Sequence, residues 1–95
     1  MISVNSPRFN LGQVVATQCA IQSLGKAQTS ARELLNRHVN ADFGSIDAED
    51  RQSNLEAIEQ GERILSSYLL KTGETLWVIT EADRSSTCIL CPSDY

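Results

Sequence analysis

The chain lacks most of the sequence features on which enzymatic and metal chemistry depend. It has one histidine, His38, and no Gly-rich phosphate loop, no H-E-x-x-H and no G-x-S-x-G. Cys88 and Cys91 form a C-x-x-C, but residues three apart on a strand point to opposite faces of the sheet. Since no second C-x-x-C is present, we expect no metal site. Because the catalytic and phosphate-binding motifs are missing as well, we expect no cofactor and no catalytic residue, and an enzyme is the less favoured class of function.

Positive charge and long hydrophobic runs are also scarce. Eight Lys and Arg stand against twelve Asp and Glu, for a formal net charge of −4. Binding to nucleic acid depends mainly on cations that neutralise phosphates, so we expect no direct nucleic acid binding and favour a basic surface on a partner protein. No run approaches the roughly 18 apolar residues of a membrane span, and no export signal is evident. We expect a cytoplasmic protein without a membrane partner.

The three cysteines are an odd number, which fits a reducing compartment better than a disulfide scaffold. We expect Cys19 to pack near the first turn of a short helix. His38 lies on or beside the apolar stripe of a second helix, where a packed and hydrogen-bonded ring is the usual arrangement. Nothing in the sequence brings these two residues together as a nucleophile and its base.

The C-terminal third predicts a three-stranded antiparallel meander. Its strands cover residues 64–70, 75–81 and 86–91, and short polar turns separate them. Residues 11–16 predict a further strand at an edge of the same sheet. Helices are expected over residues 18–24, from 31 to about 39 and from 48 to about 60, with Thr17, Ser30 and Asp47 as N-caps and Gly25 and Gly61 as stops.

The predicted fold class is therefore α+β. An antiparallel sheet of three to four strands, made of the C-terminal meander and the N-terminal edge strand, is packed by two to three short helices. Residues 1–95 form a single domain, in which 1–10 are a loose lead-in.

The turns also predict how the strands pair. Pairing Leu70 with Thr75 places Tyr68 opposite Trp77, and a two-residue turn at residues 83–84 places Trp77 opposite Leu90. One face of the sheet is then covered by the helices and holds Leu65, Leu69, Leu76, Val78, Ile89 and Cys91. The other face is apolar and holds Ile64, Tyr68, Leu70, Trp77, Ile79, Cys88 and Leu90. A patch of this size on a monomer indicates self-association or a protein partner, unless the N-terminal segment with Ile2, Val4 and Phe9 covers it.

The last predicted helix has little apolar content and carries Glu49, Asp50, Glu56 and Glu59. Its acidic face is either solvated or a docking surface. The candidate interaction residues are Tyr68, Trp77, Ile79, Leu90, Glu49, Asp50, Glu56 and Glu59.

Three segments together resemble a known group of proteins: PRFNLGQVVAT (7–17), LLNRHVNADFG (34–44) and LWVITEADRS (76–85). The chain is similar to short proteins carried on bacterial plasmids and other mobile elements. Members of that family are labelled plasmid-related or, by automatic transfer, type I restriction endonuclease subunit M. Ninety-five residues cannot supply the seven-stranded sheet of a methyltransferase, so the resemblance implies only an accessory role in a host cytoplasm.

Two classes of function follow. The first is a small acidic, non-catalytic accessory protein of a mobile genetic element that acts through protein–protein contact, for example on a host defence or DNA-processing system. The second is a small enzyme or ligand-binding domain with a pocket between helices and sheet.

Overall fold

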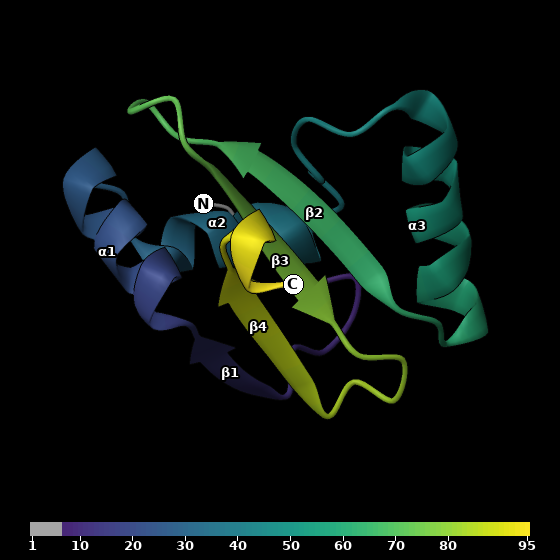
Figure 1. Ribbon diagram of the computed structural model, residues 1–95. Coiled ribbons are helices and arrows are strands. Elements are labelled where there is room, and N and C mark those ends of the chain that lie inside the picture. Colours follow the sequence, from purple (N-terminus) through teal and green to yellow (C-terminus); the bar gives the residue numbers. More distant parts are fainter. Residues whose placement is uncertain (1–6) are drawn as a thin grey trace, which may run out of the picture.

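The computed structural model describes residues 7–95. Its strands are β1 (Gln13–Ala16), β2 (Ile64–Leu69), β3 (Thr75–Thr80) and β4 (Ser86–Leu90), and its helices are α1 (Gln18–Ala27), α2 (Ala31–Val39), α3 (Ala48–Gln60) and the short 3-10 helix η1 (Pro92–Asp94). The strands form one sheet in the order β1-β4-β3-β2. Figure 1 shows α2 behind the sheet, α3 beside β2 and the C-terminal turn in front.

The predicted α+β fold is confirmed, with one correction to the sheet. β2, β3 and β4 form the expected antiparallel meander, and β1 is the expected edge strand. However, β1 runs parallel to β4, so the sheet is mixed rather than purely antiparallel. The long connection between these two strands allows either direction, and strand patterning does not distinguish them.

The helix starts follow from short polar side chains that accept a backbone N–H of the first turn. The Thr17 Oγ1 accepts from Ala20, the Ser30 Oγ from Glu33, and the Asp47 carboxylate from Asp50. Gly61 ends α3 in the left-handed conformation, as predicted. The predicted stop of α1 at Gly25 is wrong, because the helix continues to Ala27, which is buried, and Gln28 takes the left-handed position.

The predicted register of β2 on β3 is wrong by one residue. Leu69, not Leu70, pairs with Thr75, so Tyr68 lies opposite Leu76 and Trp77 lies opposite Ser67. Such a slip moves side chains to the other face relative to the neighbouring strand. The burial of Tyr68 agrees with the observed pairing, because its hydroxyl donates to the Asp42 carbonyl at 2.7 Å. The predicted register of β3 on β4 is confirmed.

Two apolar clusters lie on the side of the sheet that the helices cover, which we call the helix face. In the first, residues of α1 and α2 pack on Tyr68, Leu76, Val78 and Ile89. The second joins Phe9, Val39, Phe43, Ala57 and Ile64 around the C-terminal end of α2 and the inner side of α3. In the described residues, no helix is long and apolar enough to cross a membrane.

Candidate interaction surface

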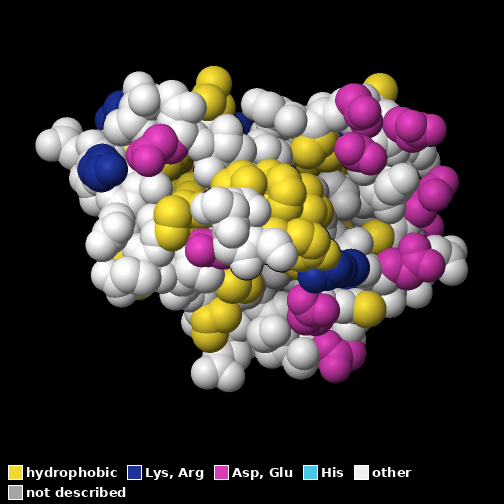
Figure 2. All heavy atoms as spheres, in the orientation of Figure 1, with side chains coloured by type: hydrophobic (Ala, Val, Ile, Leu, Met, Phe, Trp, Pro, Cys, Tyr) yellow, Lys and Arg dark blue, Asp and Glu magenta, His cyan; other side chains and the backbone are white. Residues whose placement is uncertain are grey.

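The opposite side of the sheet, the front face, carries an exposed apolar patch. Trp77 on β3 lies opposite Ser67, so its diagonal neighbours on β2 are Leu65 and Leu69. Leu69 is 63% exposed, Leu65 and Trp77 are half-buried, and Tyr95 is 69% exposed. We call Leu65, Leu69, Trp77 and Tyr95 the front patch. Figure 2 shows hydrophobic side chains gathered in the middle of this view.

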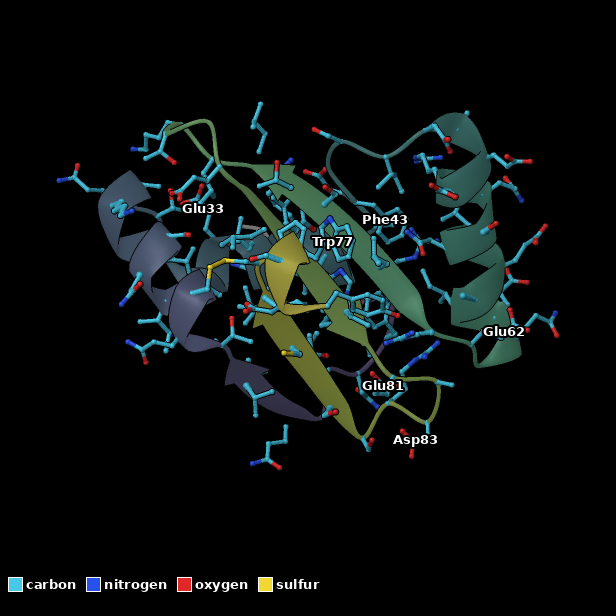
Figure 3. All side chains as sticks on the ribbon, viewed as in Figure 1. Glu33, Phe43, Glu62, Trp77, Glu81 and Asp83 are labelled. Carbon is cyan, nitrogen blue, oxygen red and sulfur yellow. A yellow bond between two sulfur atoms is a disulfide. The ribbon has the colours of Figure 1, made fainter. Side chains whose placement is uncertain are left out.

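The C-terminal segment covers part of the front face. The Tyr95 ring packs edge-on against Trp77, with centroids 5.6 Å apart, and Figure 3 shows Trp77 beside the C-terminal turn. Arg63 holds Tyr95 in place, since its Nη1 donates to the Tyr95 hydroxyl at 2.9 Å and its guanidinium lies over the ring. The Asp94 carboxylate accepts from the Cys91 N–H and the Thr17 hydroxyl, which ties η1 to the start of α1.

The four sheet residues predicted for the interaction surface therefore differ in the face on which they lie and in their burial. Trp77 lies in the front patch, and Ile79 and Leu90 are buried on the same face. Tyr68 is on the helix face, away from Trp77. The expectation of a fully open second face is corrected, because the chain's own C-terminus covers part of it.

The N-terminal segment was the other cover considered for this face. Within it, Phe9 packs edge-on against His38 in the helix-side core, with centroids 5.1 Å apart. Ile2 and Val4 lie outside the described residues.

An acidic surface lies beside β2. Helix α3 exposes Glu49, Asp50, Glu56 and Glu59, and Arg51 is the one basic residue on it. Figure 2 shows the acidic side chains over α3, next to the apolar centre of the view. The predicted acidic residues thus share one helix. Many protein interfaces likewise consist of an apolar patch with a polar or charged border.

A chain of hydrogen bonds crosses the core around the single histidine. The Thr87 hydroxyl donates to the Leu11 carbonyl at 2.8 Å, so it accepts from Thr80 at 2.7 Å. Thr80 must then accept from the His38 Nε2–H at 2.9 Å, which leaves Nδ1 to accept the Ser66 hydroxyl at 2.6 Å. The four polar side chains therefore satisfy one another with a neutral imidazole.

This network has the groups of a Ser–His pair but not the access that catalysis needs. His38, Ser66, Thr80 and Thr87 are fully buried. Burial, together with the nearby positive charge of Arg84, lowers the pKa of His38 to about 4. The packed, hydrogen-bonded histidine matches the expectation, and a substrate in solution has no route to the Ser66 hydroxyl.

Cys19 and Cys91 form a disulfide across 72 positions, which the odd cysteine count and the expectation of simple packing did not foresee. It joins the first turn of α1 to the end of β4 (Figure 3). Cys88 is a free thiol on the same face as Ile79, whereas Cys91 belongs to the helix-side core, so the predicted opposition of the C-x-x-C pair is confirmed.

Among residues 7–95, one group of side chains has the spacing of metal ligands. The Cys19 and Cys91 sulfurs and an Asp94 carboxylate oxygen lie within 4.8 Å of one another. The two sulfurs are bonded to each other, so neither is available as the thiolate that a metal needs.

A pocket of about 520 Å³ lies between the N-terminal segment and α2. Its lining has no titratable side chain and consists of Pro7, Phe9, Asn10, Leu11, Gly12, Leu35, Asn36 and Val39. Such a lining can hold an apolar molecule, but it offers no acid, base or nucleophile.

Arg84 has a role that the sequence did not reveal. Its guanidinium donates to the carbonyls of Ala57 and Glu62 at the end of α3 and to those of Glu81 and Ala82 in the β3–β4 turn. No pattern signals the contacts with Glu62 and Ala57, which lie 22 and 27 positions away.

No protein-family model, no curated protein and no solved structure matches this chain. The candidate surface therefore stands on its own geometry.

Proposed function

We propose that this chain is a small, acidic, non-catalytic accessory protein that works by binding another protein through the front patch. The exposed Leu69 beside Trp77, on which Tyr95 packs, is the observation that carries the proposal. Tyr and Trp are favoured interface anchors, because they bury large areas at a small cost in conformational entropy.

The charge beside the patch points to the kind of partner. The carboxylates of α3 attract a basic surface, and they steer encounter more than they add affinity. A basic site that normally takes nucleic acid fits this description. In the setting that the family resemblance implies, a protein of a mobile element would occupy such a site on a host defence or DNA-processing protein.

The test is affinity capture from a bacterial host lysate with matched variants. Leu69→Glu places a charge in the front patch. Ile21→Glu makes the same change at an exposed apolar residue on α1, which is 53% exposed against 63% for Leu69. We expect the wild type and Ile21→Glu to retain one basic protein in stoichiometric amount and Leu69→Glu to lose it. Equal capture by all three proteins would contradict the proposal.

The alternative of a ligand-binding domain rests on the 520 Å³ pocket beside α2. Native mass spectrometry of the purified protein distinguishes the two functions. A retained small molecule that Leu35→Trp displaces would favour the pocket, whereas the captured protein and its loss with Leu69→Glu would favour the front patch.

A further inference from the structure

The outer edge of β1 is an open strand edge. In a pair of parallel strands, every second residue directs both its N–H and its C=O to the neighbouring strand, and the residues between them direct these groups away from it. Gln13 donates to the Ser85 carbonyl and Thr17 to the Ile89 carbonyl, so Gln13, Val15 and Thr17 face β4. Val14 and Ala16 therefore point their N–H and C=O groups outward. Within residues 7–95, no strand or loop pairs with them.

The opposite edge of the sheet is protected. On β2, Ser67 donates to the Phe43 carbonyl at 3.0 Å and accepts from the Ser45 N–H at 2.7 Å. The side-chain amide of Asn54 on α3 then imitates a strand, since it accepts from the Leu65 N–H and donates to the Leu65 carbonyl. In the part of the chain that the structure describes, the fold thus covers the β2 edge twice and leaves the β1 edge free.

The side chains of β1 do nothing to discourage pairing. Natural edge strands are usually blocked by lysine, proline or a bulge. The sequence of β1 is QVVA, in which Val14 is 42% and Val15 45% exposed. No charged residue occurs between Arg8 and Lys26, although the chain as a whole carries a net charge of −4. β1 itself therefore places no charge between two copies; the nearest carboxylate at its C-terminal end, Asp94, is hydrogen-bonded to the Thr17 hydroxyl.

We propose that two copies of this chain pair antiparallel along β1, around a two-fold axis at Val15. Val14 of one copy and Ala16 of the other then exchange both backbone hydrogen bonds, and the symmetric pair does the same. Val15 lies against its own counterpart as a non-hydrogen-bonded pair, where side chains come closest. The two sheets become one, and both front patches face the same side.

This pairing is independent of the front-patch function, because Val15 and Leu69 lie on opposite edges of the sheet. The dimer would present two front patches to a partner. A four-residue strand buries little area, so we expect a weak and concentration-dependent dimer.

The test is sedimentation velocity of the full chain from low to high micromolar concentration. The wild type should shift from monomer to dimer. Val15→Lys and Val15→Glu should each stay monomeric, because identical charges meet at the axis, and an equimolar mixture of the two should recover the dimer. Ile21→Lys, which also adds a charge to the uncharged stretch, should behave as the wild type does.

A backbone variant tests the hydrogen bonds themselves. Val14→Pro removes only an outward N–H and leaves the β1–β4 ladder intact, so it should abolish the dimer while the fold is retained. A wild type that stays monomeric at all concentrations would overturn the proposal. So would a dimer that survives Val15→Lys, and a dimer that Leu69→Glu alone dissociates would assign it to the front patch instead.

Discussion

The imidazole Nδ1 of His38 lies 2.6 Å from the hydroxyl oxygen of Ser66, in the fully buried interior between α2 and the sheet. Because the Thr87 hydroxyl donates to the Leu11 carbonyl and so sets the direction of the chain of hydrogen bonds, this contact belongs to a neutral histidine with its proton on Nε2. Nδ1 accepts a hydrogen bond from the Ser66 hydroxyl and Nε2–H donates one to Thr80, so a proton added to Nδ1 would remove the acceptor of the Ser66 O–H.

Acidification should therefore destabilise the protein through His38. Burial lowers its pKa from 6.5 to about 4, so between these values the unfolded chain binds a proton that the folded chain does not. Stability from this group is complete above pH 6.5 and falls as the pH drops to 4, by about 3 kcal/mol in all. Urea denaturation at several pH values measures the loss, and His38→Gln should flatten it. Since the chain has one histidine, an NMR titration of its ring near pH 6.5 would contradict the account.

Thr87→Val should disrupt the same network with little change in shape. It removes the donor to the Leu11 carbonyl and the acceptor of the Thr80 hydroxyl, which leaves buried polar groups without partners. We expect a loss of about 1–3 kcal/mol in the free energy of unfolding. Thr75→Val, at a half-buried position on the adjacent strand, is the control and should have a much smaller effect. Equal stabilities for the two variants would argue against the network.

Reduction of the Cys19–Cys91 disulfide should lower the free energy of unfolding by about 2–4 kcal/mol, since the bond closes a long loop. Cys19→Ser should do the same and should be insensitive to reductant. Cys88→Ser should leave both the stability and its response to reductant nearly unchanged, because Cys88 is a free thiol. Alkylation of three cysteines in the native, unreduced protein would contradict the pairing.

Two glycines with similar φ angles provide a matched pair of positions for substitution by alanine. Gly44 has φ +75° and Gly61 has φ +71°, but a Cβ at Gly44 would collide with the Ser67 carbonyl, whereas nothing lies within 4 Å of one at Gly61. Gly61→Ala should cost about 1–2 kcal/mol from the left-handed backbone alone. Gly44→Ala should cost about 1–3 kcal/mol more, because the segment that covers the β2 edge must move. Equal losses in thermal denaturation would mean that this segment does not lie against Ser67.

The elements of the fold were predictable because local signals define them. Caps at Thr17, Ser30 and Asp47 and alternation in the C-terminal third predict the helices and the meander. The β2–β3 register was not predictable, because Leu69 and Leu70 are both apolar. Which of them pairs with Thr75 depends on the burial of Tyr68. Long-range contacts, such as Cys19 with Cys91, leave no periodic signal.

The candidate site was predictable only in part for the same reason. Trp77 and the acidic residues of α3 follow from composition and helix periodicity. Leu69 was assigned to the covered face, and its exposure follows from the corrected register. The partial cover of the front face comes from Tyr95, which packs on Trp77 and is hydrogen-bonded to Arg63 across 32 positions.

Site-specific photocrosslinking in host cells tests the proposed function most directly. A photoreactive amino acid at position 69 places the probe in the front patch, and one at position 21 places it on α1. The account predicts that position 69 forms one adduct with a basic protein, that position 21 does not, and that exchanging Glu49, Asp50, Glu56 and Glu59 for lysine weakens the adduct. No adduct from position 69, or the same adducts from both positions, would contradict it.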